Sequence, residues 1–156
     1  MTEENAQHSG PAISVLMSVY NGGRYLADSI RSILDQSFGD FEFLIVDDAS
    51  SDGSLEIIEE FACNDKRIVI LRNECNLGLT RSLNLGLDRA RGKYIARQDA
   101  DDISLPKRLE KQWEFLEANH EIGVMGTAYY LINACGEIIG ERSISRYFSP
   151  PPATAK

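Results

Sequence analysis

The sequence predicts a doubly wound α/β fold, in which helices cover both faces of a mostly parallel sheet. Three observations predict it. Short, β-branched apolar runs alternate with segments whose apolar side chains recur at helical spacing. The runs begin near Ile13, Phe41, Ile68 and Lys93, roughly thirty residues apart, which is the length of a βαβ unit. Polar or acidic side chains follow the runs where strands would end.

The first predicted strand is Ile13–Val19, a nearly continuous apolar run. Such runs are typical of strands buried on both faces of a parallel sheet. Tyr20-Asn-Gly-Gly23 ends the strand. A helix is predicted from Arg24, and it ends between Ser37 and Asp40.

The second predicted strand is Phe41–Val46, and two acids follow it, Asp47 and Asp48. Apolar spacing then predicts a helix over Leu55–Ala62. A third short apolar run, Ile68–Leu71, predicts the next strand. The order is again strand, helix, strand.

The next predicted helix ends before Gly92, a residue typical of helix C-termini. Four apolar side chains lie one turn apart and are expected to face the core: Leu79, Leu83, Leu87 and Ala90. Lys93–Gln98 is the fourth predicted strand. It ends in a cluster of acids.

Beyond the acids, Ser104-Leu-Pro106 is expected to open a helix that ends around Asn119. Alternating, Tyr-rich residues over Gly123–Asn133, a turn at Cys135-Gly136 and the following Glu137–Gly140 predict a C-terminal β-hairpin.

The length and composition predict one domain with a real core, since the chain has 156 residues and 43% are hydrophobic. We expect a disordered tail over residues 1–10, the domain over 11–148 and a flexible, Pro-rich tail over 149–156.

The net charge of −8 argues against nucleic acid as a partner, because a basic patch would be needed. No apolar run approaches the roughly 20 residues of a membrane span, and no signal-peptide pattern begins the chain. We expect a cytoplasmic protein without a transmembrane segment. Cys63, Cys75 and Cys135 lack metal-ligand spacing, which favours reduced, partly buried thiols.

Three carboxylates in four positions form the acidic cluster: Asp99, Asp101 and Asp102. In an extended chain Asp99 and Asp101 would point the same way, within reach of one ion. Carboxylates favour Mg²⁺ or Mn²⁺, and Mg²⁺ is typically held by one or two carboxylates plus substrate phosphates. The alternative is that one acid caps the following helix and the others are solvated.

Polar side chains follow three of the predicted strands: Tyr20-Asn21, Asp47-Asp48 and Asp99 to Asp102. In open parallel sheets, ligands bind beyond these carboxyl ends. The chain has neither a Gly-x-Gly-x-x-Gly after its first strand nor a phosphate-binding Gly-x-x-x-x-Gly-Lys-Ser/Thr loop. A phosphate-bearing ligand would therefore depend on a metal.

Four segments together resemble the successive motifs of family-two glycosyltransferases with the GT-A fold. They are Val15-Leu-Met-Ser-Val-Tyr-Asn-Gly22, Ile45-Val-Asp-Asp-Ala-Ser-Ser-Asp-Gly53, Asn76-Leu-Gly-Leu-Thr-Arg-Ser-Leu-Asn-Leu-Gly86 and Ala96-Arg-Gln-Asp-Ala-Asp-Asp102. The resemblance runs in order from about Ile13 to Leu116. It implies an inverting, metal-dependent transferase that passes a sugar from a nucleotide-diphosphate donor, such as a UDP-sugar, to an acceptor hydroxyl.

The resemblance also implies roles for individual residues. Tyr20 and Asn21 would line the pocket for base and ribose. Asp48, or its neighbour Asp47, would accept a hydrogen bond from a uracil-type base.

Asp99 and Asp101 match the family's Asp-x-Asp. There the first acid contacts ribose or a metal-bound water, and the second ligates the metal. Arg81 and Asn84 lie in the segment that approaches the nucleotide. A saccharide, a lipid-linked molecule or a protein would be the acceptor. A lipid-linked acceptor would be compatible with peripheral association of the protein with a membrane.

The general base of an inverting transfer is not identified in this sequence. Glu137 and Glu141 are carboxylates beyond the acidic cluster, but they match no base motif. The chain is therefore expected to be the donor-binding portion of a glycosyltransferase, or a non-catalytic nucleotide-sugar-binding fragment.

A response-regulator receiver is the other alternative, with Asp47-Asp48 on Mg²⁺ and Asp99 accepting a phosphoryl group. The order disfavours it, because a receiver's acid pair follows its first strand and here a complete βα unit precedes Asp47.

Overall fold

The computed structural model describes residues 9–142 and 147–148. The chain divides into two compact units, Met1–Lys111 and Gln112–Lys156, which are described separately. Except for Ser9 and Gly10, the predicted tails lie outside the described residues.

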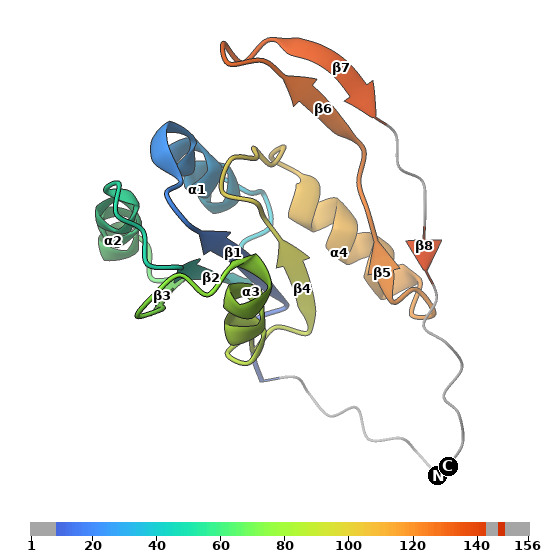
Figure 1. Cartoon of the computed structure of the whole chain (residues 1–156). Coiled ribbons are helices and arrows are strands. Elements are labelled where there is room, and N and C mark those ends of the chain that lie inside the picture. The colour runs from blue at the N-terminus through green and yellow to red at the C-terminus, as the bar shows by residue number, and fades with distance from the viewer. Residues whose placement is uncertain (1–8, 143–146, 149–156) are drawn as a thin grey trace. The chain divides into compact units, whose positions relative to one another are not determined.

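The first unit is built on a four-stranded parallel sheet. Its strands are β1 (Ile13–Val19), β2 (Phe41–Asp47), β3 (Ile68–Arg72) and β4 (Tyr94–Arg97), in the spatial order β3-β2-β1-β4 (Figure 1). All four predicted strands are confirmed. β1 and β2 are central, and all but one of their residues are buried, which explains their continuous apolar runs.

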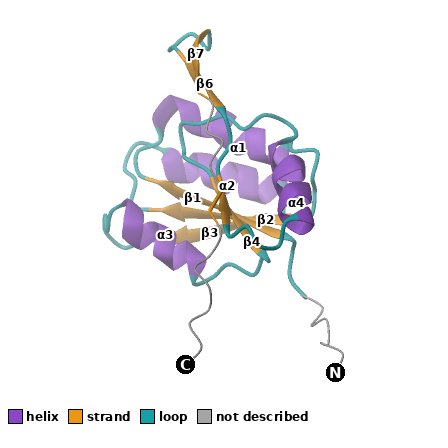
Figure 2. Ribbon diagram, turned by 90° about the vertical axis from the view of Figure 1, so that its right-hand side faces the viewer, coloured by secondary structure: helices purple, strands orange, loops and turns teal. Residues whose placement is uncertain are grey.

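Helices cover both faces of this sheet, as the predicted fold requires. A 3₁₀ turn, η1 (Gly23–Tyr25), leads into α1 (Leu26–Leu34). Figure 2 shows α1 and α2 (Ser54–Asn64) on one face, and α3 (Leu79–Leu87) on the other. The α3 crossover joins β3 to β4, at opposite edges of the sheet.

The buried face of α3 differs from the prediction. Leu79 and Leu87 are exposed, at 50% and 45%, whereas Ser82 and Gly86 are buried. The reason is the close approach of α3 to β1: a Cβ on Gly86 would overlap the side chain of Leu16. Small residues therefore face the sheet, and partly buried apolar residues pack beside them: Leu83, Leu85 and Ala90.

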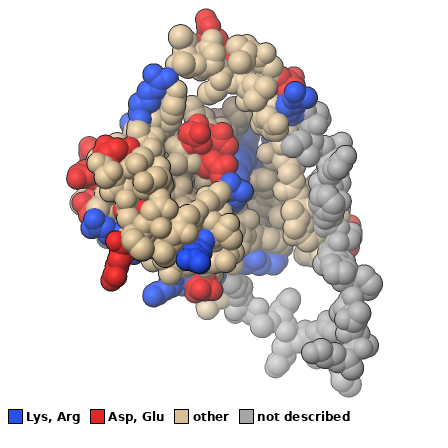
Figure 3. Space-filling model, in the orientation of Figure 1, with Lys and Arg blue, Asp and Glu red and all other residues tan. Residues whose placement is uncertain are grey.

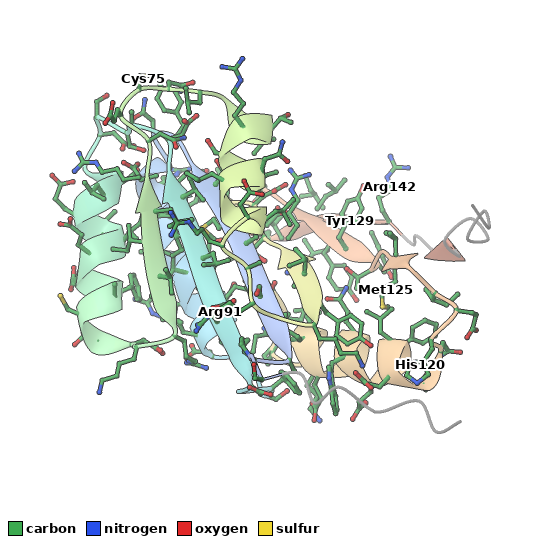
Figure 4. The ribbon with its side chains drawn as sticks, turned by 90° about the horizontal axis from the view of Figure 1, so that it is seen from below. Cys75, Arg91, His120, Met125, Tyr129 and Arg142 are labelled. Atoms are coloured by element: carbon green, nitrogen blue, oxygen red, sulfur yellow. The ribbon has the colours of Figure 1, made fainter. Side chains whose placement is uncertain are left out.

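A buried carboxylate holds the turn between α3 and β4. Glu42 Oε1 accepts hydrogen bonds from Ser14 Oγ (2.6 Å) and the Arg91 N–H (2.7 Å), and Oε2 pairs with the Arg91 guanidinium at 2.7 Å. Gly92 is pressed against the backbone of β1, where a Cβ would lie 2.6 Å from the Ile13 carbonyl carbon. Arg91 lies towards the opposite end of the strands from Cys75, which follows β3 (Figure 4).

Helix α4 (Arg108–Ala118) begins in the first unit and continues into the second. The second unit also contains β5 (Val124–Met125), β6 (Tyr129–Ile132), β7 (Ile138–Arg142) and β8 (Tyr147–Phe148). β6 and β7 pair antiparallel, with Tyr129 opposite Arg142, which confirms the predicted hairpin. β5 pairs with β8, a pairing that was not predicted.

The three cysteines are free thiols, as expected, but they are exposed rather than partly buried, because each lies at a helix end or in a loop: Cys63, Cys75 and Cys135. Across the described residues, no helix has the length and apolar character needed to cross a membrane.

Candidate functional site at the carboxyl edge of the sheet

The parallel register brings the predicted site residues to one edge. Val19 pairs with Asp47, and Asp47 with Arg72, so the loops after β1, β2 and β3 leave the sheet together. β4 ends at Arg97, opposite Leu16, and the acidic cluster continues from there.

Hydrogen bonds join the loops that follow β1 and β2. The Asn21 N–H donates to Ser50 Oγ (3.0 Å), and Asn21 Oδ1 accepts from the Ser51 N–H (2.9 Å). Asn21 and Ala49 have left-handed backbones, with φ of 51° and 60°, which costs a non-glycine residue roughly 1–2 kcal/mol. The amide oxygen of Asn21 thus has a structural partner in the neighbouring loop.

A cavity of about 390 Å³ opens between the β1 loop and the acidic cluster. Tyr20 and Asn21 line one side, and Asp99 and Asp101 line the other. Its remaining lining comes from the end of β1, the same loops, η1, the start of α3 and the end of β4: Ser18, Gly22, Tyr25, Leu79, Arg97 and Ala100. Four of the predicted site residues therefore share one cavity.

The acidic cluster is a turn organised by a buried amide. The Asp102 N–H donates to the Asp99 carbonyl (3.2 Å), which closes the turn. Gln98, only 3% exposed, donates from Nε2 to the carbonyls of Asp102 (2.7 Å) and Asp99 (3.2 Å) and to Ser29 Oγ (3.2 Å). Its Oε1 accepts from Ser104 Oγ and Arg108 Nη1, both at 2.7 Å. The position of Asp99 thus depends on Gln98, directly after β4, and on groups from α1, the Ser104 loop and α4.

Two arginines accompany the acids. Arg97 pairs with Asp99 at 2.9 Å, and Arg108 Nη2 donates to the Arg97 carbonyl at 2.6 Å. Partial burial, and then the charges of Asp99 and Asp101, raise the pKa of the Asp102 carboxyl, against the effect of both arginines. Burial lowers the pKa of Arg108, although Asp102 and Asp99 act in the opposite direction.

Both carboxylate oxygens of Asp48 accept hydrogen bonds from the loop between β3 and α3. It is 1% exposed; its Oδ1 accepts from Asn73 Nδ2 (2.6 Å) and the Leu77 N–H (2.8 Å), and its Oδ2 from the Gly78 N–H (2.8 Å). Burial acts to raise the pKa of Asp48, but these hydrogen bonds outweigh burial, and the pKa lies below its ordinary value. The carboxylate is therefore ionised and internally satisfied.

Asp47 differs from its neighbour, although it is also fully buried. Oδ1 accepts from the Ser50 N–H at 3.2 Å, but Oδ2 has no hydrogen-bond partner within the described part of the chain. Arg72 Nε lies 3.9 Å from Oδ2. A buried acceptor without a partner is costly, and such atoms call for a ligand or water.

A second cavity, of about 430 Å³, lies between the loops that follow β2 and β3. Ala49 and Ser50 line it on one side, and Arg72, Asn73 and Glu74 on the other. Residues adjoining both members of the acid pair thus line this second cavity.

Arg81 and Asn84 lie exposed on α3, and neither is among the residues that line these two cavities. Their predicted approach to a nucleotide stays a prediction.

The carboxylates of Asp99 and Asp101 fit a divalent ion whose remaining ligands come from a substrate. Asp99 and Asp101 line one cavity, but within residues 9–142 and 147–148 no three His, Cys, Asp or Glu side chains form a group able to hold a metal. Two carboxylates completed by phosphate oxygens are the usual arrangement for Mg²⁺. Basic side chains are scattered over the face shown in Figure 3 rather than gathered into a patch.

Comparison with known proteins decides the family. The model of glycosyl transferase family 2 matches residues 14–151. The chain belongs to this family. EpsE of Bacillus subtilis, a protein named as a glycosyltransferase, is 47% identical to this family-2 chain, over 83% of the chain and 47% of EpsE. An uncharacterised glycosyltransferase of Methanocaldococcus jannaschii is 45% identical, over 88% of the chain and 48% of that protein. The chain spans about half the length of both relatives.

Solved structures agree on the GT-A architecture. Staphylococcus aureus TarS in complex with UDP-GlcNAc has a TM-score of 0.66 and 26% identity, over 77% of this chain and 40% of that one. A Pyrobaculum calidifontis mannosyltransferase, solved with GDP-Man and Mn²⁺, shares the fold at 22% identity and a TM-score of 0.66, over 80% of this chain and 36% of that one. The predicted fold class is confirmed.

Sequence reasoning missed the residues that support the acids. Gln98 and Arg97 immediately precede Asp99, but in this segment the family resemblance assigns roles only to the acids. Asn73 joins Asp48 to Ser82 Oγ, at 2.6 and 2.9 Å. An uncharged polar residue at the end of a strand, such as Gln98 after β4, was the available signal, since buried polar groups need partners.

Proposed function

We propose that this chain binds a nucleotide-diphosphate sugar at the carboxyl edge of its sheet, with Mg²⁺ or Mn²⁺, and transfers the sugar to an acceptor hydroxyl with inversion. The observation that carries the proposal is the cavity of about 390 Å³ that Tyr20 and Asn21 share with Asp99 and Asp101. An aromatic ring can stack on a base, and paired carboxylates can hold the ion that binds a diphosphate.

Of the buried acid pair, neither of which lines the two cavities, we assign the base contact to Asp47 and not to Asp48. Asp48 already accepts three hydrogen bonds from the β3–α3 loop, whereas Asp47 Oδ2 has no hydrogen-bond partner among the described residues. A uracil-type base carries an N–H that could donate to Asp47. The complex of the relative TarS with UDP-GlcNAc supports a UDP-sugar as the donor.

Other residues would bind and orient the donor. Tyr20, 55% exposed at the cavity, would contact the base. Asn21 would contact the ribose through its side-chain NH₂ group, since its Oδ1 accepts from the Ser51 N–H. Arg81 and Asn84 would reach the nucleotide only after a side-chain rearrangement on α3.

Asp99 and Asp101 would hold the metal, and Asp99 would also contact ribose or a metal-bound water. When bound, the ion would offset the charge that develops on the departing diphosphate. Gln98 keeps the turn between them in place before the donor arrives. No general base is assigned.

A saccharide, lipid-linked or protein hydroxyl would accept the sugar. We propose a cytoplasmic reaction, which the three free thiols of the described residues support, with peripheral membrane association if the acceptor is lipid-linked.

The test is calorimetry of UDP and UDP-sugars, and separately of GDP, with and without Mn²⁺. We expect UDP binding that Mn²⁺ strengthens, and loss of that metal effect in Asp101→Asn. Glu56→Gln is the matched control, because it also removes one negative charge, from an exposed side chain on α2. Binding that is absent, or equally metal-dependent in Asp101→Asn, contradicts the donor site.

The runner-up function is donor binding without transfer, which the lack of an assigned base favours. Hydrolysis or transfer of a radiolabelled UDP-sugar by this chain would exclude it.

A further inference from the structure

Asp99 and Asp101 line the same cavity, but their electrostatic surroundings differ. Arg97 Nε and Nη2 both lie 2.9 Å from Asp99 Oδ1, so the guanidinium is bound to one carboxylate oxygen. Asp101 has no ion pair within the described residues. Arg97 itself lines the cavity, so its charge faces the space where a donor would bind.

The backbone on both sides of this ion pair is fixed. Arg97 is the last residue of β4 and pairs with Leu16, and its carbonyl accepts from Arg108. On the other side, the Gln98 amide holds the Asp99 carbonyl. The two side chains therefore face each other because of the strand end and the turn.

A cation that already neutralises Asp99 opposes the entry of another. A divalent ion at Asp99 must displace the guanidinium or tolerate a positive charge beside it. The pair is about half exposed, with side-chain exposures of 55% and 46%, so solvent screens it. An exposed pair of this kind shifts an equilibrium by up to roughly fivefold.

We propose that Arg97 is a positioning residue that serves as the counter-ion of Asp99 while the site is empty, and so makes metal binding depend on the donor. Metal alone binds weakly, because the guanidinium occupies one of its two carboxylates. A diphosphate supplies further oxygen ligands and a second anionic partner for Arg97. This inference rests on the proposed function and adds to it an order of dependence between metal and donor.

The test measures Mn²⁺ affinity directly, by electron paramagnetic resonance of free Mn²⁺, with and without saturating UDP. We expect Arg97→Gln to bind Mn²⁺ alone two- to fivefold more tightly than the unmodified chain. The gain in Mn²⁺ affinity that UDP produces should shrink by the same factor. By reciprocity, calorimetry should show an equal decrease in the gain in UDP affinity that Mn²⁺ produces.

Three further variants sharpen the test. Arg89→Gln removes the same charge from an exposed site after the C-terminal end of α3, and should leave Mn²⁺ affinity unchanged. In an Asp99→Asn background, Arg97→Gln should no longer strengthen Mn²⁺ binding, because the pair is already absent. Arg97→Lys keeps the charge but not the two-nitrogen contact, and should be intermediate.

The sign of the change separates this role from a merely structural one. Loss of a structural support would disorder Asp99 and weaken Mn²⁺ binding, so weaker binding in Arg97→Gln overturns the inference. So does an affinity equal to that of Arg89→Gln. If the unmodified chain binds no Mn²⁺ even with UDP, the proposed donor site fails together with the inference. Normal UDP-dependent Mn²⁺ binding that Arg97→Gln leaves unaltered refutes only the role of Arg97.

Discussion

Replacing Gln98 by leucine should both destabilise the first unit and weaken donor binding. Leucine is close in size, so the change removes hydrogen bonds with little change in volume. Three of the five bonds are short, at 2.7 Å, to Asp102, Ser104 and Arg108. A net contribution of about 1 kcal/mol for each gives a loss of about 3 kcal/mol in the free energy of unfolding.

Urea unfolding followed by circular dichroism measures this loss, and calorimetry with UDP and Mn²⁺ measures the effect on the site. The matched control is Gln36→Leu. Gln36 is also buried and donates to the Ser32 and Leu105 carbonyls, both at 2.9 Å, but it does not touch the acidic turn. Both variants should lose stability, while only Gln98→Leu should lose Mn²⁺-dependent UDP binding under conditions in which both are folded.

Two results would refute this reasoning. A free energy of unfolding within about 0.5 kcal/mol of the unmodified chain would mean that the Gln98 bonds contribute little. Equal UDP and Mn²⁺ binding in Gln98→Leu and Gln36→Leu would mean that the amide does not position Asp99.

Glu42→Gln should flatten the acid limb of the stability curve. Burial acts to raise the Glu42 pKa, but hydrogen bonds from Ser14 and Arg91 outweigh it and bring the pKa below its ordinary 4.5, so the stabilisation is present above 4.5 and is lost as pH falls through the lowered pKa. Gly92→Ala should cost about 3 kcal/mol, because a Cβ would overlap the β1 backbone. Asp48→Asn should cost about 2 kcal/mol, since an amide cannot accept at both of its ends. Urea unfolding, repeated from pH 7 to pH 3 for Glu42→Gln, measures all three.

Each of these changes has a comparison that isolates it. For Glu42, the difference between the two pH profiles matters, and parallel profiles would contradict the lowered pKa. Gly39→Ala places a methyl group in open space and should be tolerated; an equal cost at both glycines would argue against the overlap. Asp88→Asn, exposed after α3, should leave stability unchanged. A fully stable Asp48→Asn would show that the loop holds without the carboxylate.

Much of the fold could be predicted because its central strands carry their burial in their composition. β1 and β2 are apolar on both faces, so Ile13–Val19 was identified to the residue. The buried face of α3 could not be predicted, because the helical spacing of three leucines and one alanine indicates a different face from the one that carries Gly86. Only the approach to Leu16 shows that Gly86 determines which face is buried.

The candidate site was predictable in its location but not in its details. Chain order places Asp47 and Asp99 after strands, and parallel strands share an edge. The roles of Asp47 and Asp48 could not be separated, because they depend on which carboxylate meets the N–H groups of a loop 29 or 30 residues away. Gln98 has partners nearby in the chain, at Asp99, Asp102 and Ser104, but its contact with Ser29 of α1 spans 69 residues and leaves no local pattern.

The different surroundings of the two neighbouring acids have a consequence for altering donor preference. Variation at Asp48 would first disturb the path of the β3–α3 loop, so a library built there would collect misfolded chains whatever the base. Variation at Asp47 and Arg72 changes an acceptor that lacks a hydrogen-bond partner among the described residues, and the exposed cation 3.9 Å from it. Selection for a purine donor in place of a pyrimidine should therefore begin with that pair, while Asp48 is kept constant.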